Sequence, residues 1–212
     1  MTPAPSRRPL WRTSTLQRLR PLLFVLCLVP ALRWLWLAWQ AQLTANPQEF
    51  LIRSSGLWAL IILLVTLGIT PARRLLKQPA LLVWRRMLGL FSFFYTLLHM
   101  AGWALWERGL SVTAMGQDMM QRPFILIGTV ATAALLPLAI TSTNGWIKRL
   151  GKGWKQLHQL IYPAALLSIW HFWLVRSGKN DYMDPIVYGL ILAVLLLSRW
   201  QRGNTRRKKN LP

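Results

Sequence analysis

Three histidines are the side chains of this 212-residue chain best suited to chemistry: His99, His158 and His171. Each lies in a long stretch without charged residues rather than in one of the basic segments between such stretches. A neutral imidazole is a good ligand for haem iron, and helix bundles hold such cofactors between facing helices. A single histidine at such a position is explained equally well by a hydrogen bond to a neighbouring helix, but three of three favour a functional site.

The elements that must position these histidines are predicted to be membrane-spanning helices. Hydrophobic residues make up 54% of the chain and charged residues 15%. Uncharged apolar runs of about 20 residues match the thickness of a bilayer. Cys27 is the only cysteine, which excludes a disulfide framework, a zinc finger, cysteine-ligated iron–sulfur clusters and c-type haem attachment.

We expect an all-α, polytopic integral membrane protein, a bundle of six transmembrane helices. The spans are placed at about residues 21–40, 54–72, 87–106, 123–147, 156–175 and 185–200. The sixth reaches the length of a span only if Tyr182 and a snorkelling Arg199 lie in the membrane interface.

Charge is distributed unevenly between the predicted loops. The chain has 26 Lys and Arg residues against 5 Asp and Glu, for a formal net charge of +21. Most basic residues lie in segment 1–20, in the loops after the second and fourth spans and in the tail 201–212, whereas all five acids lie in or beside the other loops. The positive-inside rule then places both termini in the cytoplasm of a bacterial inner membrane. The basic ends flank one domain at 21–200, and orientation and contact with the lipid bilayer explain them, with no nucleic acid required.

Depth in the membrane brings two of the histidines to one level. The third and fifth spans both run from the cytoplasm outward, and His99 and His171 each lie in the outer half of their span. At similar depth on two parallel helices they can supply both axial ligands of one haem. His158 lies 13 residues before His171, about 20 Å lower along a helix, which predicts a second cofactor level near the cytoplasmic edge.

Arg85 is predicted to lie at the level of His158. It precedes His99 by 14 residues, which places it about 40° from the same helix face. Arginine is not a conventional haem ligand, so we expect it to pair with a haem propionate, a flavin phosphate or a lipid phosphate. An arginine that only marks the cytoplasmic side is the alternative. On a straight helix His158 and His171 are about 140° apart, although Pro163 between them could kink the helix.

Two sequence motifs resemble the MsrQ (YedZ) family, the membrane subunit of the bacterial MsrPQ system. The first motif is Arg85-Arg86-Met87-Leu88-Gly89-Leu90 followed by His99. The second comprises Thr141-Ser142, Asn144, Leu150-Gly151, Trp154, Leu157-His158, Tyr162 and His171. The resemblance extends from the first predicted span to the sixth. It implies the fold of the ferric-reductase and NADPH-oxidase membrane domains, six helices carrying b-type haem, without their flavin and nicotinamide domain.

The resemblance also implies a function and a set of site residues. Members of the family pass electrons from quinol or a cytosolic flavin reductase through the inner membrane to MsrP. MsrP is a periplasmic molybdopterin reductase that repairs methionine sulfoxide in oxidised proteins, and MsrQ is also described as binding FMN. His99, His158 and His171 match the haem histidines of the family, and Arg85 matches its arginine at the position of a missing fourth histidine. Because the larger oxidases have two histidine pairs, the number of haems, one or two, stays open.

Three classes of function are compatible with these features. We favour an electron-transfer subunit with haem b, which is an oxidoreductase component rather than the catalytic subunit. A small transporter whose histidines line a polar path and a structural membrane anchor for an enzyme are the alternatives. The near absence of acids from the predicted spans argues against a proton-coupled pump, which needs carboxylates within the membrane.

Overall fold

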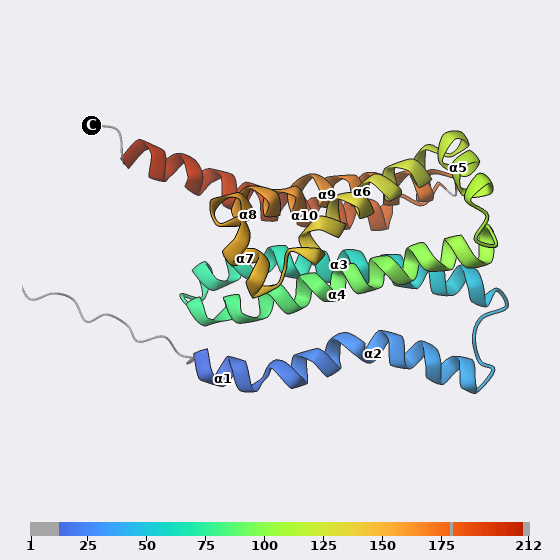
Figure 1. The fold of residues 1–212 in the computed structure, drawn as a ribbon, viewed down its shortest axis with the longest axis horizontal. Coiled ribbons are helices and arrows are strands. Elements are labelled where there is room, and N and C mark those ends of the chain that lie inside the picture. The colour runs from blue at the N-terminus through green and yellow to red at the C-terminus, as the bar shows by residue number, and fades with distance from the viewer. Residues whose placement is uncertain (1–12, 179, 210–212) are drawn as a thin grey trace, which may run out of the picture.

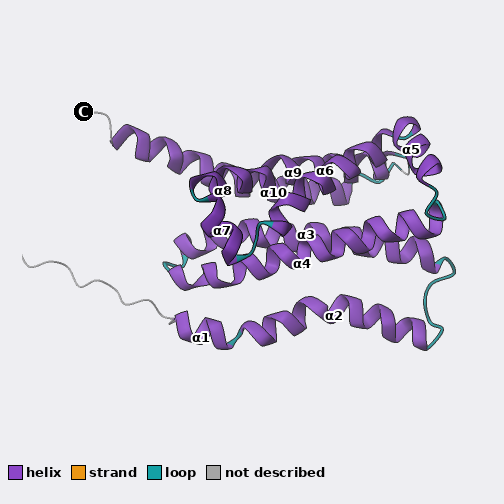
Figure 2. Cartoon of the chain, in the orientation of Figure 1, coloured by secondary structure: helices purple, strands orange, loops and turns teal. Residues whose placement is uncertain are grey.

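The computed structural model describes residues 13–178 and 180–209, and this part of the chain consists of helices joined by short turns, without strands (Figure 2). The longer helices are α2 (Arg20–Trp39), α3 (Pro47–Leu75), α4 (Leu82–Gly102), α6 (Pro123–Ile140), α9 (Ile161–Ser177) and α10 (Met183–Lys209). The shorter ones are α1 (Thr13–Arg18), α5 (Val112–Gln121), α7 (Asn144–Leu150) and α8 (Lys152–Leu157). Three further single turns are Pro79–Leu81, Trp103–Glu107 and His158–Leu160. The predicted all-α class is confirmed.

The helices form layers around the pair α3 and α4 (Figure 1). α3 packs along α4, α6 packs along α9, and α10 contacts both α9 and α3. In Figure 1, α6, α9 and α10 lie on one side of the α3–α4 pair, and α2 lies on the other. α7 and α8 lie near one end of the bundle and α5 lies at the other. The start of α1 and the end of α10 both lie at the end near α7 and α8.

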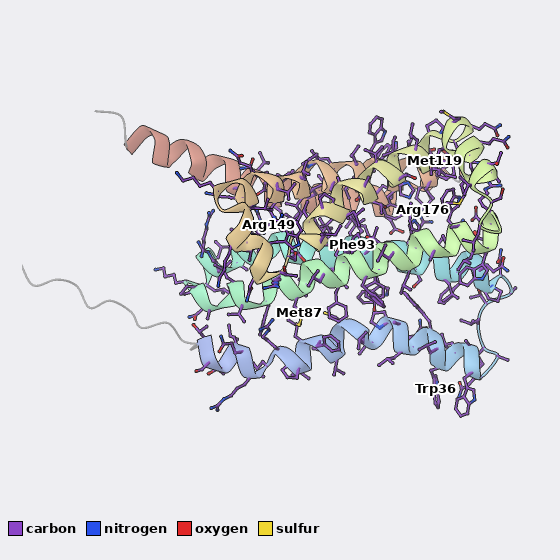
Figure 3. All side chains as sticks on the ribbon, in the orientation of Figure 1. Trp36, Met87, Phe93, Met119, Arg149 and Arg176 are labelled. Atoms are coloured by element: carbon purple, nitrogen blue, oxygen red, sulfur yellow. The ribbon has the colours of Figure 1, made fainter. Side chains whose placement is uncertain are left out.

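Helix α4 packs side chains toward both neighbouring layers. Toward α2, Tyr95 is fully buried, and its hydroxyl donates a 2.7 Å hydrogen bond to the carbonyl of Cys27. Met87 also lies on this side, whereas Phe93 packs on the side of α9 and α10 (Figure 3). The position of α4 between two layers explains why His99, which α4 carries, can meet residues of several helices.

Small residues allow α9 to approach the centre of the bundle closely. Ala164 and Ala165 are fully buried in a cluster with Leu63 and Leu67 of α3 and Leu192 of α10. Lipid provides no hydrophobic driving force between helices, so close van der Waals packing at small residues is a main source of helix association in membranes. This packing fixes the position of α9, and therefore of His171, relative to α3.

Four helical segments of the described chain are long and apolar enough to cross a membrane: Thr13–Trp39, Pro47–Leu75, Pro79–Glu107 and Pro123–Ile140. They coincide with the first four predicted spans. At the places of the fifth and sixth predicted spans the chain is also helical, with α9 of 17 residues and α10 of 27 residues. The chain is therefore a helical membrane protein, and the count of six spans stays a prediction.

The predicted fourth span, 123–147, is two helices rather than one. α6 ends at Ile140, and α7 begins at Asn144. At the end of α6 the hydroxyls of Thr141 and Ser142 donate to the carbonyls of Pro137 and Leu138, and the Thr143 hydroxyl accepts from the backbone N–H of Trp146 as the cap of α7. Such side-chain bonds to the backbone compete with helix continuation and favour a new N-cap.

A buried carboxylate organises the segment between α4 and α6, for which the sequence analysis predicted only a loop. Asp118 of α5 is 5% exposed. It accepts hydrogen bonds from Arg108 at 2.7 and 2.8 Å and from the indole N–H of Trp103 at 3.0 Å, and it pairs with Arg122 at 3.1 Å. The charge is compensated by two arginines, as a buried acid requires. These bonds tie α5 to the end of α4 and the start of α6.

Candidate functional site

The structure brings His99 of α4 and His171 of α9 together. The centroids of their imidazole rings are 5.9 Å apart, and the ring planes are inclined at 79°. The two residues are 72 positions apart in the sequence, so the contact is made by tertiary packing alone. Both side chains are partly buried.

Each of these imidazoles is held by one backbone carbonyl of a neighbouring helix. Nδ1 of His99 lies 2.8 Å from the carbonyl oxygen of Ile52 in α3, and Nδ1 of His171 lies 2.6 Å from that of Phe124 in α6. A carbonyl oxygen can only accept, so Nδ1 carries the proton and donates it. In a neutral imidazole this leaves Nε2 with a free lone pair. Both rings are thus fixed in the tautomer that ligates a metal through Nε2.

The pair is a chemically suitable donor set for haem, because two neutral imidazoles from different helices lie in contact and both have Nε2 free. His99 and His171 would hold the iron, and the haem would supply one-electron chemistry. The carbonyl acceptors supply the outer hydrogen bonds that ligating histidines usually make, which raise the basicity of the ligand.

His158 lies at the junction of α8 and α9, in the single turn His158–Leu160. Its ring stacks on the indole of Trp154, with the ring centroids 3.9 Å apart and the planes inclined at 28°. Its Nδ1 lies 3.1 Å from the carbonyl oxygen of Trp154, whose own indole N–H donates to the carbonyl of Thr141 at 2.9 Å. The sequence predicts His158 just inside the fifth span, and the structure places it in the turn before α9.

Arg85 lies in the first turn of α4 and is partly buried. The start of α4 lies at the end of the bundle near α7 and α8, and the turn that holds His158 follows α8 (Figure 1). The structure therefore places Arg85 and His158 in one neighbourhood at the end of the bundle near α7 and α8, and it places His99 and His171 in another.

Arg199 is a residue of this neighbourhood that the sequence analysis assigned elsewhere. It was expected to reach the membrane interface, but its guanidinium donates to the Tyr162 hydroxyl at 2.6 Å and to the carbonyl of Leu67. Its Nε atom is buried without a hydrogen-bond partner. The signal in the sequence was that Arg199 is the one charged residue within the predicted span 185–200, and a charge inside a span is unusual unless it is used.

Within residues 13–178 and 180–209, Arg85 and Arg199 make no ion pair with a carboxylate. The five acids are Glu49, Glu107, Asp118, Asp181 and Asp184, and they lie at the start of α3, the end of α4, in α5 and around the start of α10. These positions are all at the end of the bundle where α5 lies (Figure 1). Arg85 and Arg199 are therefore suited to an anionic group from outside the protein, such as a phosphate or a carboxylate.

Comparison with known proteins gives a consistent result. The family model described as "Ferric reductase like transmembrane component" matches residues 55–169, a range that includes His99 and His158 and ends just before His171. A protein of Bordetella pertussis named "Protein-methionine-sulfoxide reductase heme-binding subunit MsrQ" is 50% identical over 194 residues, which cover 90% of this chain and 94% of the relative. Proteins of the same name from Herminiimonas arsenicoxydans and Polaromonas naphthalenivorans are 46% and 41% identical, covering 91% and 90% of this chain and 88% and 90% of the relatives. No solved structure matches.

Proposed function

The chain belongs to the MsrQ family of ferric-reductase-like transmembrane proteins, and from this premise we propose that it is the haem-binding electron-transfer subunit of a protein-methionine-sulfoxide reductase system. The observation that carries the proposal is the pair His99 and His171. Two neutral imidazoles from different helices, each donating from Nδ1 to a carbonyl and with the rings 5.9 Å apart, would hold the iron of one haem b. The haem supplies one-electron transfer, and the protein supplies ligation and position.

A second redox site is proposed at the other end of the bundle, around His158 and Arg85. Support comes from the location of both residues at one end of the bundle, from the stacking of His158 on Trp154, and from Arg199, whose Nε atom is buried without a hydrogen-bond partner. Arg85 and Arg199 would hold the propionates of a second haem, and His158 would be its single protein ligand. FMN, held by its phosphate, and a quinol are the other candidate occupants. One or two haems are therefore compatible with the proposal.

The direction of electron flow follows from the proposed orientation. With both termini in the cytoplasm of the inner membrane, the His158–Arg85 neighbourhood faces the cytoplasm and the His99–His171 pair lies toward the periplasm. Electrons would enter from the quinone pool or from a cytosolic flavin reductase and leave outward. The acceptor is proposed to be the periplasmic molybdopterin reductase MsrP, which repairs methionine sulfoxide.

The test is the visible spectrum of the purified full-length protein, with haem counted per polypeptide. We expect a reduced b-type α band, which neither a transporter nor a structural anchor requires. His99→Ala and His171→Ala should each remove the haem between these residues while the protein still inserts, because insertion depends on the apolar helices. His158→Ala is the matched control and should retain that haem. Unchanged haem content and spectrum in His99→Ala would exclude the ligation.

A further inference from the structure

The two histidines are held by two copies of one arrangement. In the α3–α4 pair the elements are the Ile52 carbonyl, Gly56 and His99; in the α6–α9 pair they are the Phe124 carbonyl, Gly128 and His171. The sequence separation from carbonyl to histidine is 47 residues in both copies. In both, the glycine follows the carbonyl residue by four positions.

The spacing of four has a physical reason. In an α-helix the carbonyl of residue i accepts from the N–H of residue i+4, so Ile52 bonds Gly56 within α3 and Phe124 bonds Gly128 within α6. A carbonyl oxygen has a second lone pair, but the side chain of residue i+4 lies beside it. A glycine at i+4 leaves this side of the carbonyl open, and the imidazole N–H occupies it.

The contact distances show how closely the imidazoles fill this space. A Cβ atom on Gly56 would lie 2.9 Å from Nδ1 of His99, and a Cβ on Gly128 would lie 2.8 Å from Nδ1 of His171. Carbon atoms do not approach ring atoms this closely, so either ring would have to move. Gly102 at the end of α4 is equally enclosed, since a Cβ there would lie 2.8 Å from Cγ1 of Ile52, but its neighbours are not histidines. Gly68 and Gly189 have more space. A Cβ on Gly68 would lie 3.9 Å from its nearest neighbour, and one on Gly189 would lie 3.6 Å from its own, which is ordinary contact.

We propose that Gly56 and Gly128 are positioning residues of a duplicated histidine clamp, in which each glycine admits one imidazole to the carbonyl that orients it for a shared ligand. This rests on the proposed function for the identity of the ligand, haem, but the clamp itself is a property of the chain. The two copies predict equivalent roles for the two glycines. They also predict that an added methyl group acts through the histidine, not through the helix that carries the glycine.

The effect on the ligand is predicted by the hydrogen bond. Gly56→Ala displaces the His99 ring from the Ile52 carbonyl, and Gly128→Ala displaces His171 from the Phe124 carbonyl. An imidazole that no longer donates from Nδ1 is a weaker base and stabilises ferric iron less. We therefore expect each variant to lose haem, or to keep it with an altered low-spin signature and a midpoint potential shifted upward. Gly68→Ala and Gly189→Ala are matched controls and should behave as the unmodified protein.

A thermal-unfolding cycle on full-length protein prepared without haem tests the clamp separately from the proposed function. Gly56→Ala should lower the Tm when residue 99 is histidine, because the added methyl group displaces the ring. In the His99→Ala background the space is free and alanine favours the helix, so Gly56→Ala should raise the Tm or leave it unchanged. Gly68→Ala should give the same shift in both backgrounds. The cycle is repeated with Gly128 and His171, so that one unstable variant does not decide the result.

The outcomes separate two questions. Coupling of each glycine to its own histidine, with the spectral change in the haem-loaded protein, supports the clamp and its role. If the Tm cycle shows this coupling but the unmodified protein binds no haem when haem is supplied, the clamp is supported and the proposed ligand is overturned. The clamp is overturned if each glycine variant shifts the Tm equally with and without its histidine. It is also overturned if the haem spectrum and midpoint potential are unchanged in both glycine variants. Either result holds even where His99→Ala and His171→Ala remove the haem.

Discussion

At the scale of single residues, backbone carbonyls decide what the histidines can do. His99 and His171 each use Nδ1 to bond the carbonyl of a residue 47 positions earlier, which fixes the tautomer that leaves Nε2 free. His158 instead lies within 3.1 Å of the carbonyl of Trp154, four positions earlier, and stacks on that indole. The first two histidines are oriented by other helices, and the third by its own segment. Their different environments agree with different roles.

The second redox site is testable at His158 and Arg85. In His158→Ala and in Arg85→Ala we expect the haem between His99 and His171 to be retained and its reduction by the cytoplasmic donor to slow by tenfold or more, about 1.4 kcal/mol in activation free energy. The physical reason is loss of the ligand or of the cation that holds the first cofactor. The measurements are total cofactor content and the rate of haem reduction in a stopped-flow spectrometer.

Arg149→Ala provides the control for this experiment. Arg149 stands over the ring of Trp146 in α7 and carries the same charge at the same end of the bundle. Its variant should keep the normal rate. If His158→Ala and Arg85→Ala also keep full cofactor content and the normal rate, there is no second redox site in this neighbourhood.

At the scale of the elements, short polar contacts place the helices that carry the site. Arg199 of α10 bonds Tyr162 of α9 and the Leu67 carbonyl of α3, so one guanidinium joins three helices. Asp118 joins α5 to the end of α4 and the start of α6. α4 carries His99 and α6 carries the carbonyl that holds His171. The contacts at Asp118 are therefore linked to both halves of the histidine pair.

Removing the charge of Asp118 is predicted to loosen this end of the bundle. Asp118→Asn leaves Arg108 and Arg122 without their carboxylate and weakens a bidentate contact, at a cost of about 2 kcal/mol. We expect a lower Tm and faster proteolysis within 107–122, with haem retained at reduced stability. Glu107→Gln removes an exposed acid from the same segment and should change neither measurement. Equal behaviour of the two variants would show that Asp118 does not organise α5.

At the scale of the whole molecule, the distribution of charge and the shape of the bundle agree. All five acids lie toward the end where α5 lies, and both ends of the described chain lie at the opposite end (Figure 1). Many large apolar side chains of α2, α6 and α10 are exposed, among them Leu26, Leu35, Leu126 and Leu190. Such outward faces suit contact with lipid.

The orientation is tested by reporter fusions. Fusions at Asp118 and Asp181 should report the periplasm, and fusions after Lys77 and Lys152 should report the cytoplasm, because the basic loops resist translocation. The paired reporters alkaline phosphatase and green fluorescent protein give opposite signals at each position and serve as mutual controls. A cytoplasmic signal at Asp118 would reverse the map and place the His99–His171 pair on the inner side.

Several features follow from the sequence because they depend on local chemistry. Apolar runs must be helical in a membrane, where backbone groups can only bond within the segment, so the helices around His99 and His171 are predictable. Their similar depth is also predictable, since each residue advances a helix by about 1.5 Å. The resemblance carried by Arg85 and His158 identified the family, and the comparisons confirm it.

Other features were decided only by tertiary structure. The break after Ile140 depends on two hydroxyls: that of Ser142 bonds back to the Leu138 carbonyl, and that of Thr143 caps the next helix. The hydropathy of the segment does not show which backbone group each hydroxyl will bond. The inward position of Arg199 depends on Tyr162 and Leu67, which are far away in the sequence. The sequence sets the depth of a residue along its helix, whereas rotation about the helix axis and the choice of neighbour depend on how distant segments pack. For this reason the glycines that admit His99 and His171 to their carbonyls were visible only once the helices were placed side by side.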